Sequence, residues 1–244
     1  MSTRTWGERL VCHLQGHVFL FGNRRSPEYD PSAGLRLLLI FVLLEGVIGP
    51  RLWLFSLCGL PVPPTWLRVP VLLVLAMVLI RFFAGVRLTQ IGLYRWRNWS
   101  LTEKSYLIQV FVIANVVFGL LYATRLRMIA ADPGLWWRPA AIAVFTSFLW
   151  GFHQELVYRG ILQTELVRRW GSVVGVLVSN LLFTFGPLHF YHFSGRAPLL
   201  MFTAIFVIGL FFGVLFRRSG NLAIICILHG LGNCYIEGLG RLGH

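Results

Sequence analysis

The sequence is poor in several kinds of residue, and each shortage excludes a class of protein. It has only 4 cysteines in 244 residues, and none are spaced as Cys-x-x-Cys, so neither a disulfide framework nor a cysteine zinc site is predicted. Charged residues make up only 13% of the chain, about half the share found in soluble domains. A soluble globular enzyme is therefore excluded. The remaining composition is 57% hydrophobic and indicates an integral membrane protein.

Lysine is almost absent, since Lys104 is the only one, and the net charge of +13 comes from arginine. The arginines lie between apolar runs rather than on one polar face, so nucleic-acid binding is not predicted. In such positions they act as topology signals and contact anionic lipids of the bilayer. The arginine-rich composition favours a bacterial protein, and hence the bacterial inner membrane.

Residues 1–34 are polar and mixed and lack the pattern of a cleavable signal peptide. They are predicted to form an N-terminal cytoplasmic or interfacial segment, in which 9–22 is a weak candidate for an interfacial helix. Arginines are more frequent in the loops on the same side as this segment, so the positive-inside rule predicts a cytoplasmic N-terminus. Residues 87–103, with several aromatic and basic side chains, are predicted to be interfacial.

Long apolar runs predict an all-α fold, a polytopic membrane helix bundle with about seven transmembrane helices (six to eight), since each needs ~20 mostly apolar residues. The qualifying stretches are 35–57, 65–86, 104–123, 139–169, 172–192, 197–216 and the shorter 220–237. No linker divides the chain, so residues 35–244 are predicted to form one bundle. A transporter is disfavoured because neither inverted repeats nor paired broken helices are found.

Three short polar motifs interrupt the apolar stretches of the second half. They are Gln154-Glu155-x-x-x-Arg159-Gly160, Phe185-x-x-x-His189 and His229-x-x-x-Asn233. Ionisable side chains are costly in lipid, so those that occur there usually face the bundle interior and mark function.

Helix geometry predicts that the three motifs meet inside the membrane. Gly171 is predicted to end one helix; Glu155 lies 16 residues before it and His189 18 residues after it, which places both about 24–27 Å from the turn. His229 and Asn233 lie about 14–20 Å from their own turn, shallower by one or two helical turns.

The residue types suit hydrolysis by an activated water. Glu155 and Arg159 have the i, i+4 spacing of an ion pair within a helix. Glu155, aided by His189, would take a proton from water, while His229 and Asn233 would donate hydrogen bonds to the developing oxyanion.

At these motifs the sequence resembles the CAAX-protease and bacteriocin-processing family of glutamic-type intramembrane endopeptidases, which includes the Rce1-like proteases. The family pattern is Glu-Glu-x-x-x-Arg, Phe-x-x-x-His and His-x-x-x-Asn, and residues 139–235 form the protease-like core. The resemblance implies that His189 positions water, that His229 and Asn233 hold the oxyanion, and that Arg159 organises the carboxylate of the first motif.

The sequence departs from the family pattern at Gln154, where the family has the glutamate usually taken as the base. An amide does not accept a proton at neutral pH, which leaves three alternatives. Glu155 is the base, or Glu237 or Glu45 replaces it, or the protein is non-catalytic. A membrane-anchored or hydrophobic peptide or protein is the expected substrate of an active enzyme, and a binding, immunity or regulatory role is expected otherwise.

Other interpretations of the polar residues are structural. The Glu155–Arg159 pair could hold the bundle together, and His229 and Asn233 could join helices by hydrogen bonds. Gly209-x-x-x-Gly213 is interpreted as packing within the bundle. No cofactor or metal site is predicted, because a compact three-ligand set for zinc is not recognisable. The oligomeric state is not predicted.

Overall fold

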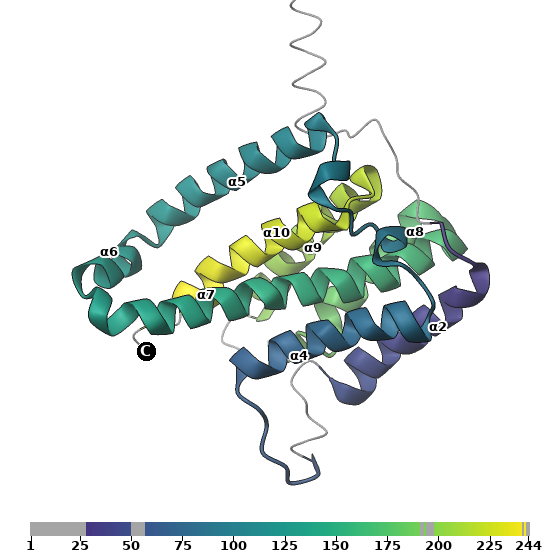
Figure 1. Cartoon of the computed structure of the whole chain (residues 1–244), viewed down its shortest axis with the longest axis horizontal. Coiled ribbons are helices and arrows are strands. Elements are labelled where there is room, and N and C mark those ends of the chain that lie inside the picture. Colours follow the sequence, from purple (N-terminus) through teal and green to yellow (C-terminus); the bar gives the residue numbers. More distant parts are fainter. Residues whose placement is uncertain (1–27, 50–56, 191–192, 194–197, 241, 243–244) are drawn as a thin grey trace, which may run out of the picture.

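The computed structural model describes residues 28–49, 57–190, 193, 198–240 and 242. These residues form helices and no strand, and 6 segments are long and apolar enough to cross a membrane. The helices are α2 (Pro31–Phe41), α4 (Thr65–Val78), α5 (Leu101–Leu121), α6 (Ala123–Ala131), α7 (Pro133–Glu155), α8 (Thr164–Phe185), α9 (Pro198–Ser219) and α10 (Leu222–Asn233). The predicted all-α membrane bundle is confirmed (Figure 1).

Short helical segments of other types extend or connect these helices. The π-helices η1 (Val42–Ile48), η2 (Leu79–Phe83), η5 (Leu156–Gln163) and η7 (Cys234–Leu239) continue α2, α4, α7 and α10, and the 3-10 turns η3 (Leu88–Ile91) and η4 (Trp96–Asn98) precede α5. π-Helical turns are rare and often occur at functional sites. Here one of them begins directly after Glu155 and contains the rest of the first motif, and another begins directly after Asn233, the last residue of the third motif.

The difference between seven predicted helices and six segments has a local cause. The helices predicted over 139–169 and 172–192 belong to one continuous segment, Pro133–Phe185. Within it Gly171 has non-helical torsions of φ 80° and ψ 171°, which glycine adopts without steric cost. The chain therefore turns at Gly171, as predicted.

Two predicted boundaries are corrected by the structure. The first span begins at Pro31 and ends at Ile48, before the predicted end at residue 57. The helix predicted over 172–192 ends at Phe185, so His189 lies in a turn rather than on a helix. Pro187 explains the early end, because proline disfavours a helical conformation in the residue before it. The interfacial helix predicted over 9–22 lies outside the described residues.

Helices α7 and α10 form the centre of the bundle and lie side by side over much of their length (Figure 1). α4 packs on α7 and α8 packs on α9. A Cβ atom added to Gly151 on α7 would meet the backbone nitrogen of Gly230 on α10 at 2.7 Å. This contact permits no side chain between the two helices at that level. It brings the first motif, which follows Gly151, close to the third motif, which contains Gly230.

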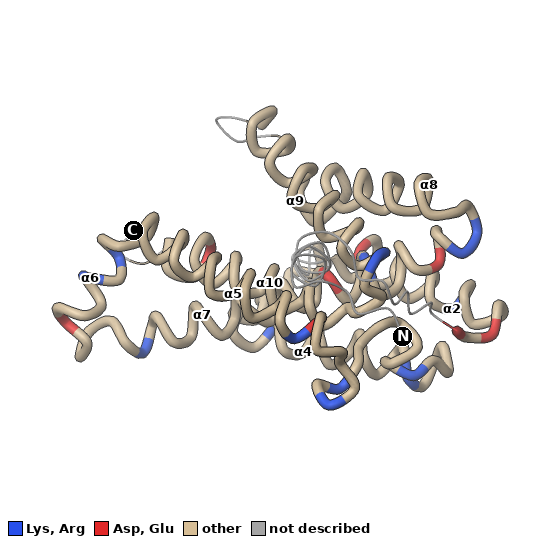
Figure 2. Tube along the Cα trace, turned by 90° about the horizontal axis from the view of Figure 1, so that it is seen from above, with Lys and Arg blue, Asp and Glu red and all other residues tan. Residues whose placement is uncertain are grey.

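The outer surfaces of the helices are apolar, and the basic side chains lie mainly near helix ends (Figure 2). At the Gly171 turn the buried Glu165 carboxylate accepts hydrogen bonds from Tyr29 Oη at 2.9 Å, Arg168 Nε at 2.9 Å and Arg169 Nε at 2.5 Å. Burial and the Glu165 carboxylate raise the pKa of Tyr29 above its usual range, so the phenol stays protonated and donates. These bonds join the start of α2 to α8.

Candidate active site

A carboxylate and an imidazole form the centre of the site. Glu155, the last residue of α7, has no exposed surface, and its Oε1 lies 2.6 Å from Nδ1 of His229 on α10. The sequence analysis paired Glu155 with His189, but the histidine that bonds it comes from the third motif. The ring of Phe212 stacks on His229 at 5.3 Å between ring centroids. The imidazole is therefore held at one nitrogen and on one face.

Arg159 contacts the same carboxylate oxygen as His229. Its Nη1 lies 3.3 Å from Glu155 Oε1, as the i, i+4 spacing predicted, and its Nη2 donates to the Gly209 carbonyl oxygen at 2.8 Å. The guanidinium also lies 4.1 Å from the ring centroid of Phe183, within the range of a cation–π interaction. Arg159 is 1% exposed. A charge buried this deeply is tolerated because it is paired and hydrogen-bonded.

The Gly209-x-x-x-Gly213 pattern receives these side chains. One turn after Arg159, Gln163 Nε2 donates to the Gly213 carbonyl oxygen at 2.8 Å. A Cβ atom on Gly209 would lie 3.0 Å from Arg159 Nη2, and one on Gly213 would lie 2.9 Å from Gln163 Oε1. The glycines therefore let two long polar side chains reach the backbone of α9. The interpretation of this pattern as packing within the bundle is confirmed.

Gln154 and Asn233 form a second contact between the first and third motifs. Asn233 Nδ2 lies 3.4 Å from Gln154 Oε1, a long and weak hydrogen bond. Gln154 is buried, and Asn233 is partly exposed. Gln154 therefore lies beside the partly exposed Asn233, whereas Glu155 faces the buried Arg159 and the partly buried His229.

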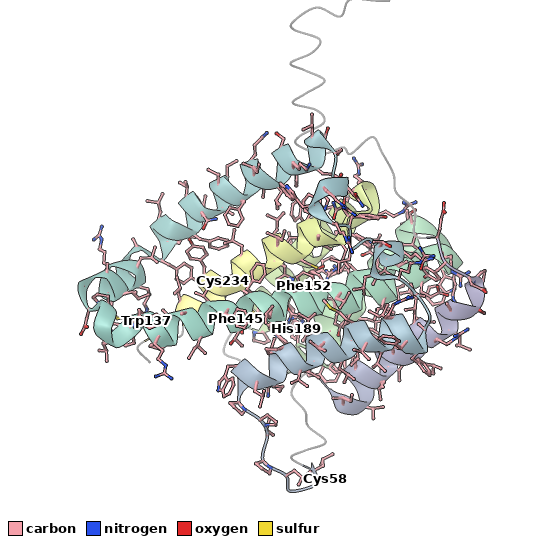
Figure 3. The ribbon with its side chains drawn as sticks, viewed as in Figure 1. Cys58, Trp137, Phe145, Phe152, His189 and Cys234 are labelled. Carbon is pink, nitrogen blue, oxygen red and sulfur yellow. The ribbon has the colours of Figure 1, made fainter. Side chains whose placement is uncertain are left out.

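His189 reaches the other motifs through an aromatic ring. Its Nδ1 lies 2.7 Å from the Phe183 carbonyl oxygen, and its ring packs edge-on against the Phe183 ring at 4.9 Å. The same ring packs against His229 at 6.1 Å and against Tyr158 at 5.2 Å. Figure 3 labels His189 near the middle of the molecule. Phe183 is thus the residue on which all three motifs converge, and the sequence analysis did not single it out.

The remaining acids and histidines of this region lie around the site. Glu45 is 2% exposed and accepts a hydrogen bond from Tyr158 Oη at 2.8 Å, so a phenol is its partner. Glu237 is partly buried in η7. His153 stacks on Trp150 at 5.3 Å with an interplanar angle of 2°. This stacking fits a packing role for His153.

Among the described residues, no three His, Cys, Asp or Glu side chains are grouped so that they could hold a metal ion. Glu155, His189 and His229 therefore do not form a recognisable ligand set, and the prediction of a metal-free site remains a prediction.

The chain is a polytopic α-helical membrane protein whose polar motifs meet inside the bundle around the buried Glu155 and Arg159 and the partly buried His229. Residues 136–235 match the family described as Type II CAAX prenyl endopeptidase Rce1-like. This match agrees with the resemblance that the three motifs had indicated. A search of the curated proteins found no match, and a search of the solved structures found none either.

Proposed function

We propose that the protein is an intramembrane endopeptidase of the bacterial inner membrane. It would hydrolyse a peptide bond in a membrane-anchored or hydrophobic protein or peptide. The observation that carries this proposal is the contact of 2.6 Å between Glu155 Oε1 and His229 Nδ1 inside the bundle, because it provides a base even though Gln154 occupies the usual position of one.

The proton transfers follow from the hydrogen bonds. An ionised carboxylate only accepts, so Nδ1 of His229 carries the hydrogen that is shared with Glu155, and Nε2 has a lone pair. Nε2 takes a proton from water as the water oxygen attacks the scissile carbonyl carbon, and it later gives that proton to the leaving amine. Glu155 orients the ring and stabilises the imidazolium, and Arg159 balances the charge of the carboxylate. This assigns the base to His229, whereas the sequence analysis favoured Glu155.

Asn233 and Gln154 would stabilise the oxyanion, and His189 would position the water. The Asn233 and Gln154 side chains each carry N–H donors suited to the oxyanion that develops on the carbonyl oxygen. His189 would position the water. Its Nδ1 faces a carbonyl oxygen, which only accepts, so Nε2 is the acceptor nitrogen of that ring. In this scheme an amide at position 154 is compatible with catalysis.

A non-catalytic binding or regulatory role is the second candidate. It is favoured by Gln154, which replaces the family's glutamate beside the partly exposed Asn233, and by the complete burial of Glu155. Under this alternative the Glu155–His229 contact would only join α7 to α10.

A cleavage assay distinguishes the two. The purified protein in lipid nanodiscs is incubated in H₂¹⁸O with a panel of farnesylated and unmodified hydrophobic peptides, and products are read by mass spectrometry. Hydrolysis places one ¹⁸O in the new carboxylate. We expect cleavage by the wild type and by Gln154→Glu, and loss in His229→Gln. His153→Gln is the matched control, since it changes a buried histidine outside the site.

Equal cleavage by the wild type and His229→Gln would refute the proposed base. If only Gln154→Glu cleaves any peptide, the natural protein is the non-catalytic relative.

A further inference from the structure

A groove between α8 and α9 lies outside the candidate active site. It has a volume of about 390 Å³, which is within the roughly 300–1,000 Å³ of typical ligand sites. Its wall is made by the aliphatic side chains Val173, Val176, Leu177, Leu210 and Val214, and its polar end by Ser172, Arg217 and Arg218. None of these residues contributes to the Glu155–His229 site.

The polar end has several features that attract a negative charge. Arg217 Nε donates to Ser172 Oγ at 2.8 Å, which joins the end of α9 to the start of the second part of α8. Arg217 and Arg218 are both partly exposed. Because the chain turns at Gly171, the first backbone N–H groups after this turn lie at the same end, where the helix dipole also favours an anion.

The polar end of the groove lies where the headgroup of a membrane lipid would lie, and its aliphatic wall lies where the acyl chain would lie. The arginines follow the last apolar turn of α9, and Val214, Leu210 and Val176 lie one or more turns deeper in the apolar part of the helices. Trp170 at the adjacent turn is 55% exposed, and tryptophan is enriched at membrane interfaces. Figure 2 shows basic residues at this turn of α8. The positive-inside rule predicts that this end is cytoplasmic, where anionic lipids give the membrane a negative surface.

We propose that this groove is a binding site for one anionic phospholipid. Its acyl chain lies against the aliphatic wall, and its phosphate lies against Arg217 and Arg218. A neutral lipid or a detergent would cover the same wall but would bring no negative charge to the two guanidinium groups. Headgroup charge is therefore the property that the site selects.

Native mass spectrometry of the full chain tests the proposal, with phosphatidylglycerol and phosphatidylcholine added at equal concentrations. Each basic residue near an anionic membrane surface contributes roughly a fivefold gain in binding. We therefore expect Arg217→Gln/Arg218→Gln to weaken phosphatidylglycerol binding about tenfold or more. Arg125→Gln/Arg127→Gln on α6 removes the same charge outside the groove and should bind as the wild type does.

A second variant tests the acyl-chain part of the site. Val214→Trp fills the groove from its exposed side and keeps both arginines, so it should also weaken phosphatidylglycerol binding. Equal binding of the two lipids to the wild type, or equal losses in the groove and α6 variants, would overturn the proposal. Unchanged binding in Val214→Trp would do the same, because the lipid would then bind by its headgroup alone. Finding the groove occupied by detergent or by a second copy of the chain would also contradict the proposal of a phospholipid site.

Discussion

Replacing Glu155 by glutamine should reveal how strongly the site depends on one buried negative charge. The substitution keeps the shape of the side chain but removes the charge that faces Arg159 at 3.3 Å and His229 at 2.6 Å. Both Glu155 and Arg159 are almost completely buried, with 0% and 1% exposure. Removing one partner of such a pair leaves an uncompensated buried charge and typically costs about 3–5 kcal/mol.

The expected loss in the free energy of unfolding is therefore about 3–5 kcal/mol, measured by SDS titration in mixed micelles with tryptophan fluorescence as the signal. The double variant Glu155→Gln/Arg159→Gln should recover part of it, since the unpaired charge is then gone. Catalysis should fall further than stability explains. Changing the carboxylate behind a catalytic histidine to an amide lowers kcat by roughly 10⁴ in a serine protease.

Glu103→Gln is the matched control, because Glu103 is also buried and accepts hydrogen bonds from Ser100 N and Asn221 Nδ2. It should lower stability without changing turnover per folded molecule. Wild-type stability in Glu155→Gln would refute the argument that this pair supports the bundle. Wild-type turnover in the folded fraction of Glu155→Gln would refute its role in catalysis.

Three further predictions concern helix packing, the buried Glu45 carboxyl and the effect of a metal chelator. Gly209→Ala should lower the free energy of unfolding by about 1–3 kcal/mol, because its Cβ would meet Asn180 and Arg159. Gly119→Ala, which has open space around it, should be neutral or stabilising. SDS titration compares the two variants. Tyr158→Phe should cost about 1–3 kcal/mol in the same titration, since the buried Glu45 carboxyl loses its donor, and a smaller loss in Glu45→Gln would fit retention of that bond. Cleavage should be unchanged by 1,10-phenanthroline in the peptide assay, because the proposed mechanism uses Glu155 and His229 and no metal. Inhibition would contradict this.

Much of the fold could be predicted because its signals are local. The length of an apolar run decides whether a helix can cross a membrane, so the spans could be located from the sequence. The ends predicted at residues 57 and 192 nevertheless lie beyond those observed at Ile48 and Phe185. Gly171 marked the turn between two helices because glycine readily adopts a positive φ. The i, i+4 spacing of Glu155 and Arg159 likewise predicted their ion pair.

The predictions that failed depended on longer-range contacts or on detail at a helix end. Depth along the membrane could not reveal that Glu155 bonds His229, since several polar groups lie at similar depths. The helix predicted over 172–192 was extended past Pro187, although proline disfavours a helical conformation in the residue before it, and His189 therefore lies in a turn. The hydrogen bond between Tyr158 and Glu45 joins residues 113 positions apart in the chain, so no local pattern could predict it.

The sequence by itself determined that this is an all-α membrane protein, which polar residues are candidates for its chemistry, and which family its second half resembles. These properties follow from composition, hydropathy and motif spacing, which need no knowledge of how helices face one another. The tertiary structure decided the pairing of the motifs. The close approach of Gly151 and Gly230 sets the rotation and separation of α7 and α10, and through them the contact of Glu155 with His229. Partner choice in a bundle depends on this rotation and separation, which arise only when the helices pack.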